Sequence, residues 1–253
     1  MQNKHRYLSV SLVALLIAVS GSGCSREAKK NRYLERANRY FQAGQYEKAE
    51  LEYLNVLRLN PQNPVAVSRL GSICFEQGRP GSAFSLLRKA EQLQPDDLDV
   101  RLKLGLTCLN LAGFKQARDE AIYILEKQPT NDEALLLLAE ASLTPKDMDD
   151  MQQRLQKLAS QIEKRPGFQL ALGILHLRRQ DFTNAESEIN QAIALDPKFA
   201  AAHHALGSFY LSRNDPEKAE SAFKTGSDLA PMRSLRRLRY ADFKIQTGDL
   251  ETG

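Results

Sequence analysis

A repeat of 34 residues runs through the chain and restricts its fold more than any other feature of the sequence. Rows of this length follow one another without an insertion, and they begin at Lys30, Pro64, Leu98, Asp132, Pro166, Ala200 and Ser234. Position 8 of every row is a small residue: Ala37, Gly71, Gly105, Ala139, Gly173, Gly207 and Ala241. Self-similarity at such a period predicts stacked structural units.

Two further positions indicate how each row is built. Position 20 is small in most rows: Ala49, Ala83, Ala117, Ala185, Ala219 and Gly253. Position 32 is proline in most rows: Pro61, Pro95, Pro129, Pro197 and Pro231. Small residues at positions 8 and 20 let two helices approach closely, and a proline cannot continue the second helix. We therefore expect a leucine at Gly105 to overpack this contact. Gly44, Gly78 and Gly248 can form the turn between the helices.

This pattern resembles the tetratricopeptide-repeat (TPR) family, whose unit is a 34-residue helix–turn–helix. Aromatic or proline residues fill position 17 in most rows, as in that family: Tyr46, Pro80, Phe114, Phe182 and Pro216. The abundance of strong helix formers and the lack of alternating strand patterns also predict an all-α class. The resemblance covers residues 30–253. It implies a right-handed superhelical solenoid of antiparallel helix pairs with a concave groove.

Two rows depart from the pattern. In the row that begins at Asp132, Thr144 and Pro145 fall where the first helix should end, and Met151 replaces the small residue at position 20. We expect either a splayed repeat that bends the array or a repeat whose sequence has merely drifted. The last row, from Ser234, is half a repeat. It is either a capping helix, which repeat arrays need, or the start of a longer, truncated array.

The first residues form an export signal. Lys4 and Arg6 precede an apolar run over residues 8–19, and small residues follow it. This order is typical of a secretory signal peptide, here predicted over residues 1–23. The run is shorter than the ~20 residues that span a bilayer, so a permanent transmembrane helix is the weaker interpretation.

The small residues directly before Cys24 resemble the lipobox of bacterial lipoproteins, in which this cysteine is lipidated and becomes the mature N-terminus. Gly21 departs from that motif, which usually has an aliphatic residue there, so ordinary signal-peptidase cleavage is the alternative. The resemblance implies a lipid anchor on Cys24 and a polar tether over residues 24–29. Ser25 after the cysteine implies delivery to the outer membrane, facing the periplasm, if the source has two membranes.

The TPR resemblance implies that ligands lie against positions 2, 5, 9, 12 and 13 of the first helix of each repeat. Positions 5 and 12 are mostly apolar and position 9 is mixed, which suits an extended or helical segment of a partner protein. The candidate contacts are Phe41, Leu102, Leu109 and Leu177; the alternative is that they pack between repeats. Only Asn38 matches the carboxylate clamp of TPR domains that bind chaperone C-termini, so no clamp is expected.

The sequence offers no catalytic or cofactor-binding motif, and no metal site is expected. His203 and His204 are adjacent, so on a helix they point about 100° apart. The net charge of +4 includes two cations of the signal, and a nearly neutral remainder argues against nucleic acid as a partner. Cys74 and Cys108 are expected to be buried thiols, because neighbouring helices pack ~8–10 Å apart and a disulfide needs Cα atoms ~6 Å apart.

Together these features predict a non-enzymatic, membrane-anchored TPR scaffold that binds partner proteins in the bacterial cell envelope. The architecture is similar to bacterial TPR lipoproteins that assist pilus or secretin assembly or are linked to polysaccharide export. Assembly of such a machine is therefore the expected role. The alternative is the N-terminal docking module of a longer enzyme or transport component.

Overall fold

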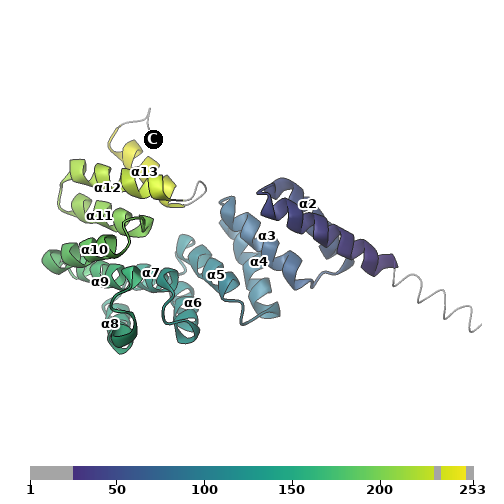
Figure 1. Cartoon of the computed structure of the whole chain (residues 1–253), viewed down its shortest axis with the longest axis horizontal. Helices are drawn as coiled ribbons and strands as arrows, with labels where there is room; N and C mark the ends of the chain where they lie inside the picture. The colour runs from purple at the N-terminus through teal and green to yellow at the C-terminus, as the bar shows by residue number, and fades with distance from the viewer. Residues whose placement is uncertain (1–24, 231–234, 249–253) are drawn as a thin grey trace, which may run out of the picture.

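The computed structural model describes residues 25–230 and 235–248. Within these ranges the chain forms α-helices joined by short turns and contains no strand. Antiparallel helix pairs stack into a curved array (Figure 1), which confirms the all-α class and the TPR solenoid. No helix in the described ranges has the length and apolar character needed to span a bilayer. The predicted signal peptide and Cys24 lie outside these ranges.

The first helix of each later repeat begins at the first residue of its row or one residue beyond it. These helices are α3 (Pro64–Glu76), α5 (Leu98–Asn110), α7 (Asp132–Ala141), α9 (Pro166–Arg178), α11 (Ala200–Ser212) and α13 (Leu235–Gln246). The side chains of Asn63, Asp97 and Asn131 cap α3, α5 and α7 by accepting hydrogen bonds from backbone N–H groups. Such caps pair donors that the first turn of a helix leaves unsatisfied.

The second helices of the repeats are α2 (Tyr46–Leu59), α4 (Pro80–Leu93), α6 (Phe114–Lys127), α8 (Pro145–Ile162), α10 (Phe182–Leu195) and α12 (Pro216–Leu229). Apart from α8, each ends shortly before the proline at position 32, as predicted. Gly44 and Gly78 have φ of +67° and +66° in the turns between paired helices, and Gly248, which follows α13, has φ of +87°. The predicted role of Gly44 and Gly78 in these turns is therefore confirmed, whereas that of Gly248 stays a prediction.

The small residues allow the helices of a pair to touch. A Cβ atom added at Gly173 would lie 2.7 Å from Cγ1 of Ile189 and 3.4 Å from the carbonyl oxygen of Ala185. Stacking of the pairs buries a continuous apolar cluster from α3 to α9, with smaller clusters at both ends. Cys74 and Cys108 are free and buried in the largest cluster, as expected, and burial raises the pKa of both thiols.

The structure differs from the expected organisation at the N-terminus. Residues 25–29 of the expected polar tether belong to a helix that runs over residues 25–42 and forms the first helix of the first repeat. The first repeat therefore begins ahead of Lys30.

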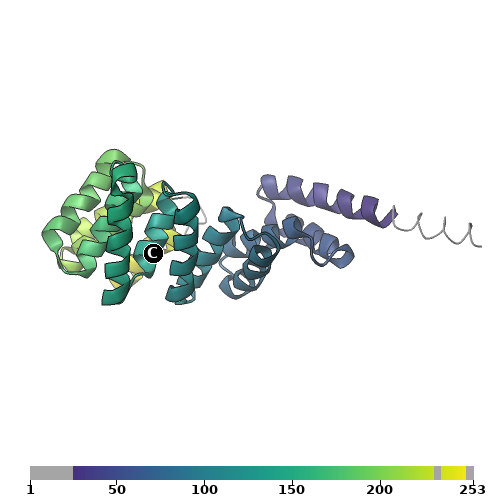
Figure 2. The ribbon, with the colours of Figure 1, turned by 90° about the horizontal axis from the view of Figure 1, so that it is seen from below.

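The fourth repeat is splayed, which settles the alternative left open by its sequence. Its first helix, α7, has 10 residues where α5 has 13. Thr144 and Asp147 form a capping box that starts α8 at Pro145, ahead of the register of the other second helices. As a result α8 packs only weakly on α7 and projects from the array (Figures 1 and 2).

Candidate partner-binding groove

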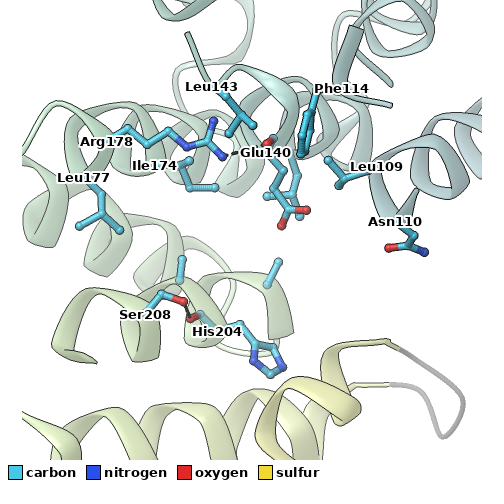
Figure 3. Close-up of a pocket in the computed structure, with 13 residues that line it drawn as sticks. Leu109, Asn110, Phe114, Glu140, Leu143, Ile174, Leu177, Arg178, His204 and Ser208 are labelled. Carbon is cyan, nitrogen blue, oxygen red and sulfur yellow. Dashed lines mark hydrogen bonds between the residues drawn. The ribbon is translucent and has the colours of Figure 1, made fainter. Parts of the chain in front are cut away.

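A cavity of about 450 Å³ lies along the first helices of repeats three to six (Figure 3). Helices α5, α7, α9 and α11 supply almost all of its lining. The larger apolar residues that line it are Leu109, Phe114, Leu136, Leu143, Ile174 and Leu177. The polar ones are Asn110, Glu140, Arg178, His204 and Ser208.

Most of the lining residues occupy the positions at which the TPR resemblance places ligands. Position 12 of three successive repeats contributes Leu109, Leu143 and Leu177. Position 9 of the fourth, fifth and sixth repeats contributes Glu140, Ile174 and Ser208. The fourth and fifth repeats thus each add both positions to one face, whereas the third adds position 12 and the sixth adds position 9. We refer to this cavity and its lining as the groove.

The four predicted contact residues all pack against core clusters, and two of them also line the groove. Leu109 and Leu177 line the groove. Phe41 packs against Tyr46 in the N-terminal cluster, with ring centroids 5.6 Å apart, and Leu102 packs against the central core. All four side chains are partly buried, so contact of any of them with a partner stays a prediction.

The early end of α7 shapes the middle of the groove. Leu143 lies beyond the helix and is 43% exposed. Arg178, at the end of α9, donates from Nη2 to the carbonyl oxygen of Glu140 at 2.8 Å and from Nη1 to the carbonyl oxygen of Ser142. The last carbonyls of a helix need such external donors. Arg178 thus takes the place of the missing turn of α7.

Sequence reasoning missed Arg178, although a signal was present. A helix stopped early by Thr144 and Pro145 leaves carbonyl groups without intrahelical donors, so a nearby cation is expected. Burial is the main cause that lowers the pKa of Arg178. A guanidinium nevertheless remains protonated in proteins, so all its donors stay in place.

Glu140 and Arg178 give the groove one charge of each sign. The side chain of Glu140 points away from α7 into the cavity (Figure 3), and it carries the only carboxylate among the described lining residues. The arrangement can hold an apolar segment beside polar groups near the middle.

The two adjacent histidines of α11 lie in different surroundings. His204 is buried beside Phe223, with ring centroids 5.9 Å apart. The Nε2 atom of His203 lies 2.9 Å from the carbonyl oxygen of Pro197. Within the described ranges, no group of three His, Cys, Asp or Glu side chains is placed to hold a metal ion.

Known proteins with this fold are themselves TPR proteins. A family model described as "Tetratricopeptide repeat" matches residues 34–97 and 170–231. A thermophilic TPR protein of Thermus thermophilus aligns with a TM-score of 0.56 and 21% identity, over 72% of this chain and 99% of that one. The type IV pilus biogenesis factor PilW aligns with a TM-score of 0.57 and 14% identity, over 88% of this chain and 97% of that one. The pilF protein of Pseudomonas aeruginosa aligns with a TM-score of 0.53 and 17% identity, over 88% of this chain and 99% of that one.

Curated relatives share the repeats at low identity. DnaJ homolog subfamily C member 3 of Gallus gallus is 24% identical over 240 residues, which cover 95% of this chain and 44% of that protein. BBSome complex member BBS4 of Bos taurus is 23% identical over 244 residues, which cover 83% of this chain and 47% of that protein. The chain thus spans less than half the length of these relatives.

The fold and the groove define the class of protein, which is a helical repeat scaffold for protein–protein interaction. The family match and the shared architecture then identify the chain as a tetratricopeptide-repeat protein.

Proposed function

We propose that this chain is a lipid-anchored TPR scaffold of the bacterial cell envelope, which binds a segment of a partner protein in the groove. The groove itself is the observation that carries the binding role. Leucines at position 12 of successive repeats form its apolar side, and Glu140 supplies a charge that can orient a bound segment. An extended or helical segment with apolar side chains at regular spacing has the matching chemistry.

The envelope location is supported by the sequence of the first 24 residues. A basic start, an apolar run and small residues before Cys24 are the features on which the anchor is proposed. Several acyl chains on Cys24 would hold the protein durably, because each buried methylene contributes ~0.8 kcal/mol. We place the anchored protein at the outer membrane, facing the periplasm.

The partner is proposed to belong to an envelope machine such as a pilus, a secretion system or a polysaccharide exporter. PilW, which shares the fold, is described as a type IV pilus biogenesis factor. The scaffold would act in such a machine by holding one component during assembly, without chemistry of its own.

Site-specific photo-crosslinking in living cells tests the groove. A photoreactive residue at Leu143, which is 43% exposed in the groove, should give a discrete crosslinked band. The matched control is Leu195 at the end of α10, which is 46% exposed and does not line the groove. Crosslinks at Leu195 with none at Leu143 would place the binding surface elsewhere.

Metabolic labelling with a fatty-acid probe tests the anchor separately. The full chain should be labelled and should fractionate with membranes, and Cys24→Ala should abolish both properties. An unlabelled wild-type chain would exclude the lipid anchor and leave the groove proposal standing.

A further inference from the structure

The first described helix, residues 25–42, is strongly basic. Six residues of this helix are Lys or Arg and two are Glu, which gives it a net charge of +4. That equals the net charge of the whole 253-residue chain. The residues that follow have no net positive charge in sum, although α13 is also basic, with three Arg and one Lys against one Asp.

The cations lie mainly on one side of this helix. Lys29, Arg32, Arg36 and Arg39 are separated by three, four and three residues, so they share a helix face, and all four are exposed. Ala37 is fully buried on the side that packs against α2. We refer to the face formed by these four cations as the basic face.

The basic face has few internal partners. Arg36 donates to Oε2 of Glu52 on α2 at 2.9 Å. Within the described part of the chain, Lys29, Arg32 and Arg39 form no ion pair with a carboxylate. The other acidic groups of the helix are Glu27, which pairs with Lys30, and the exposed Glu35. Three of the four cations thus remain available to an external anion.

Tyrosine side chains lie among these cations. The ring centroid of Tyr33 is 5.9 Å from Nζ of Lys29 and 5.1 Å from Cζ of Arg36. The ring of Tyr40 is 5.6 Å from Nζ of Lys48 on α2. Both tyrosines are half-buried. Long cationic side chains beside amphipathic rings suit a membrane–water interface, where apolar parts insert and polar tips remain hydrated.

The place of the helix in the array fits this chemistry. It lies at the opposite end from α13 and packs only on its inner side (Figures 1 and 2). Its first described residue directly follows Cys24, the proposed lipidation site. An acylated Cys24 would hold the first turn at the bilayer surface, where the next cations can reach phosphate groups.

We propose that the basic face binds the headgroups of anionic phospholipids and so fixes the orientation of the array on the membrane. The location of the basic face beside a bilayer rests on the proposed lipid anchor. Its attraction to anionic headgroups does not, because that follows from its own cations. Each cation near an anionic surface strengthens binding by about fivefold, and salt weakens the attraction.

Vesicle co-sedimentation of the chain from residue 24, with Cys24→Ser, tests the proposal without an acyl chain. All the solenoid contacts described above lie between residues 25 and 248, so this chain keeps them. It should bind vesicles of phosphatidylethanolamine and phosphatidylglycerol but not vesicles of phosphatidylcholine. The variant Lys29→Glu/Arg32→Glu/Arg39→Glu should bind the anionic vesicles at least about tenfold more weakly.

The matched control is Lys157→Glu/Lys198→Glu/Lys224→Glu, which makes the same change in net charge at exposed positions on later repeats. It should bind like the parent chain, and far-UV circular dichroism should show both variants folded. An equal loss of vesicle binding in both variants would mean that binding depends only on the net charge of the chain, and it would overturn the proposal. Absence of binding to anionic vesicles would also overturn it and would point to an acidic protein as the ligand. Neither result bears on Cys24 labelling or on groove crosslinking, which test the proposed function.

Discussion

At the scale of single residues, the turn between paired helices has one backbone geometry whatever residue occupies it. Gly44 and Gly78 have φ of +67° and +66°, and Ala112, Gln180 and Asn214 occupy the same position in later repeats at φ of 57°, 61° and 58°. The left-handed region costs a non-glycine residue roughly 1–2 kcal/mol, although asparagine tolerates it better. The packing of the repeat therefore overrides local preference at these three turns.

Glycine at Gln180 should stabilise the protein by about 0.5–1 kcal/mol. The substitution relieves the strain at φ 61°, and the greater freedom of glycine in the unfolded chain offsets part of this gain. Urea unfolding measures the difference in the free energy of unfolding. Asn214→Gly is the control and should gain less. A destabilised Gln180→Gly would show that the turn holds no relievable strain.

Leucine at Gly105 should destabilise the fold by about 1–3 kcal/mol or more, because the site has no room. A Cβ atom there would lie 2.5 Å from Cδ2 of Leu137 and 3.2 Å from Cβ of Glu120. The matched control is Gly81→Leu, since a Cβ atom at Gly81 meets no heavy atom within 4 Å. Thermal unfolding of both variants checks this. Equal midpoints would mean that the helix pair adjusts freely and that the small residue at position 8 is dispensable.

At the scale of helices, the sequence predicted where helices begin better than how far they run. Capping residues and prolines recur in register, so signals in one row reinforce those in the next. The length of α7 depends instead on a capping box at Thr144 and on a donor, Arg178, from the following repeat. Residues 25–29 were expected to belong to a tether because they are polar, yet glutamate, alanine and lysine are also strong helix formers.

Methionine at Arg178 should cost about 1–3 kcal/mol of stability. It keeps much of the side-chain volume but removes the donors to the carbonyl groups of Glu140 and Ser142, which then lack their partner. Arg179→Met is the control, because Arg179 forms a partly exposed pair with Asp149 that contributes about 1 kcal/mol or less. Urea unfolding should separate the two variants. Similar values would show that solvent satisfies the end of α7 equally well.

At the scale of the whole molecule, the sequence predicted where the groove lies but not how exposed its lining residues are. The repeat register places positions 9 and 12 of successive helices on one face, which is why Leu109 and Leu177 line the groove. Phe41 has the same register but packs against neighbouring rings in its own repeat. The exposure of Leu143 follows from the splay of one repeat, which depends on contacts between repeats. Such contacts cannot be read from any single row.

The same array predicts that stability varies along the chain. Each repeat contacts mainly its neighbours, so opening should follow the local extent of buried apolar surface. The largest cluster joins α3 to α9, whereas the C-terminal cluster contains the buried residues Ala219, Phe223 and Phe243. Hydrogen–deuterium exchange read by mass spectrometry should therefore be slowest in α5, α6 and α9 and fastest in α13.

Within the centre of the array, α8 should exchange faster than α6, because it packs only weakly on α7. Arg178→Met should accelerate exchange in α7 and α8 and leave α3 and α4 unchanged, since the lost hydrogen bonds lie at the end of α7. Uniform exchange along the chain, or acceleration of every helix in this variant, would contradict the prediction. Either result would mean that the solenoid opens as one cooperative unit, in which a bound segment at the groove would stabilise every repeat equally.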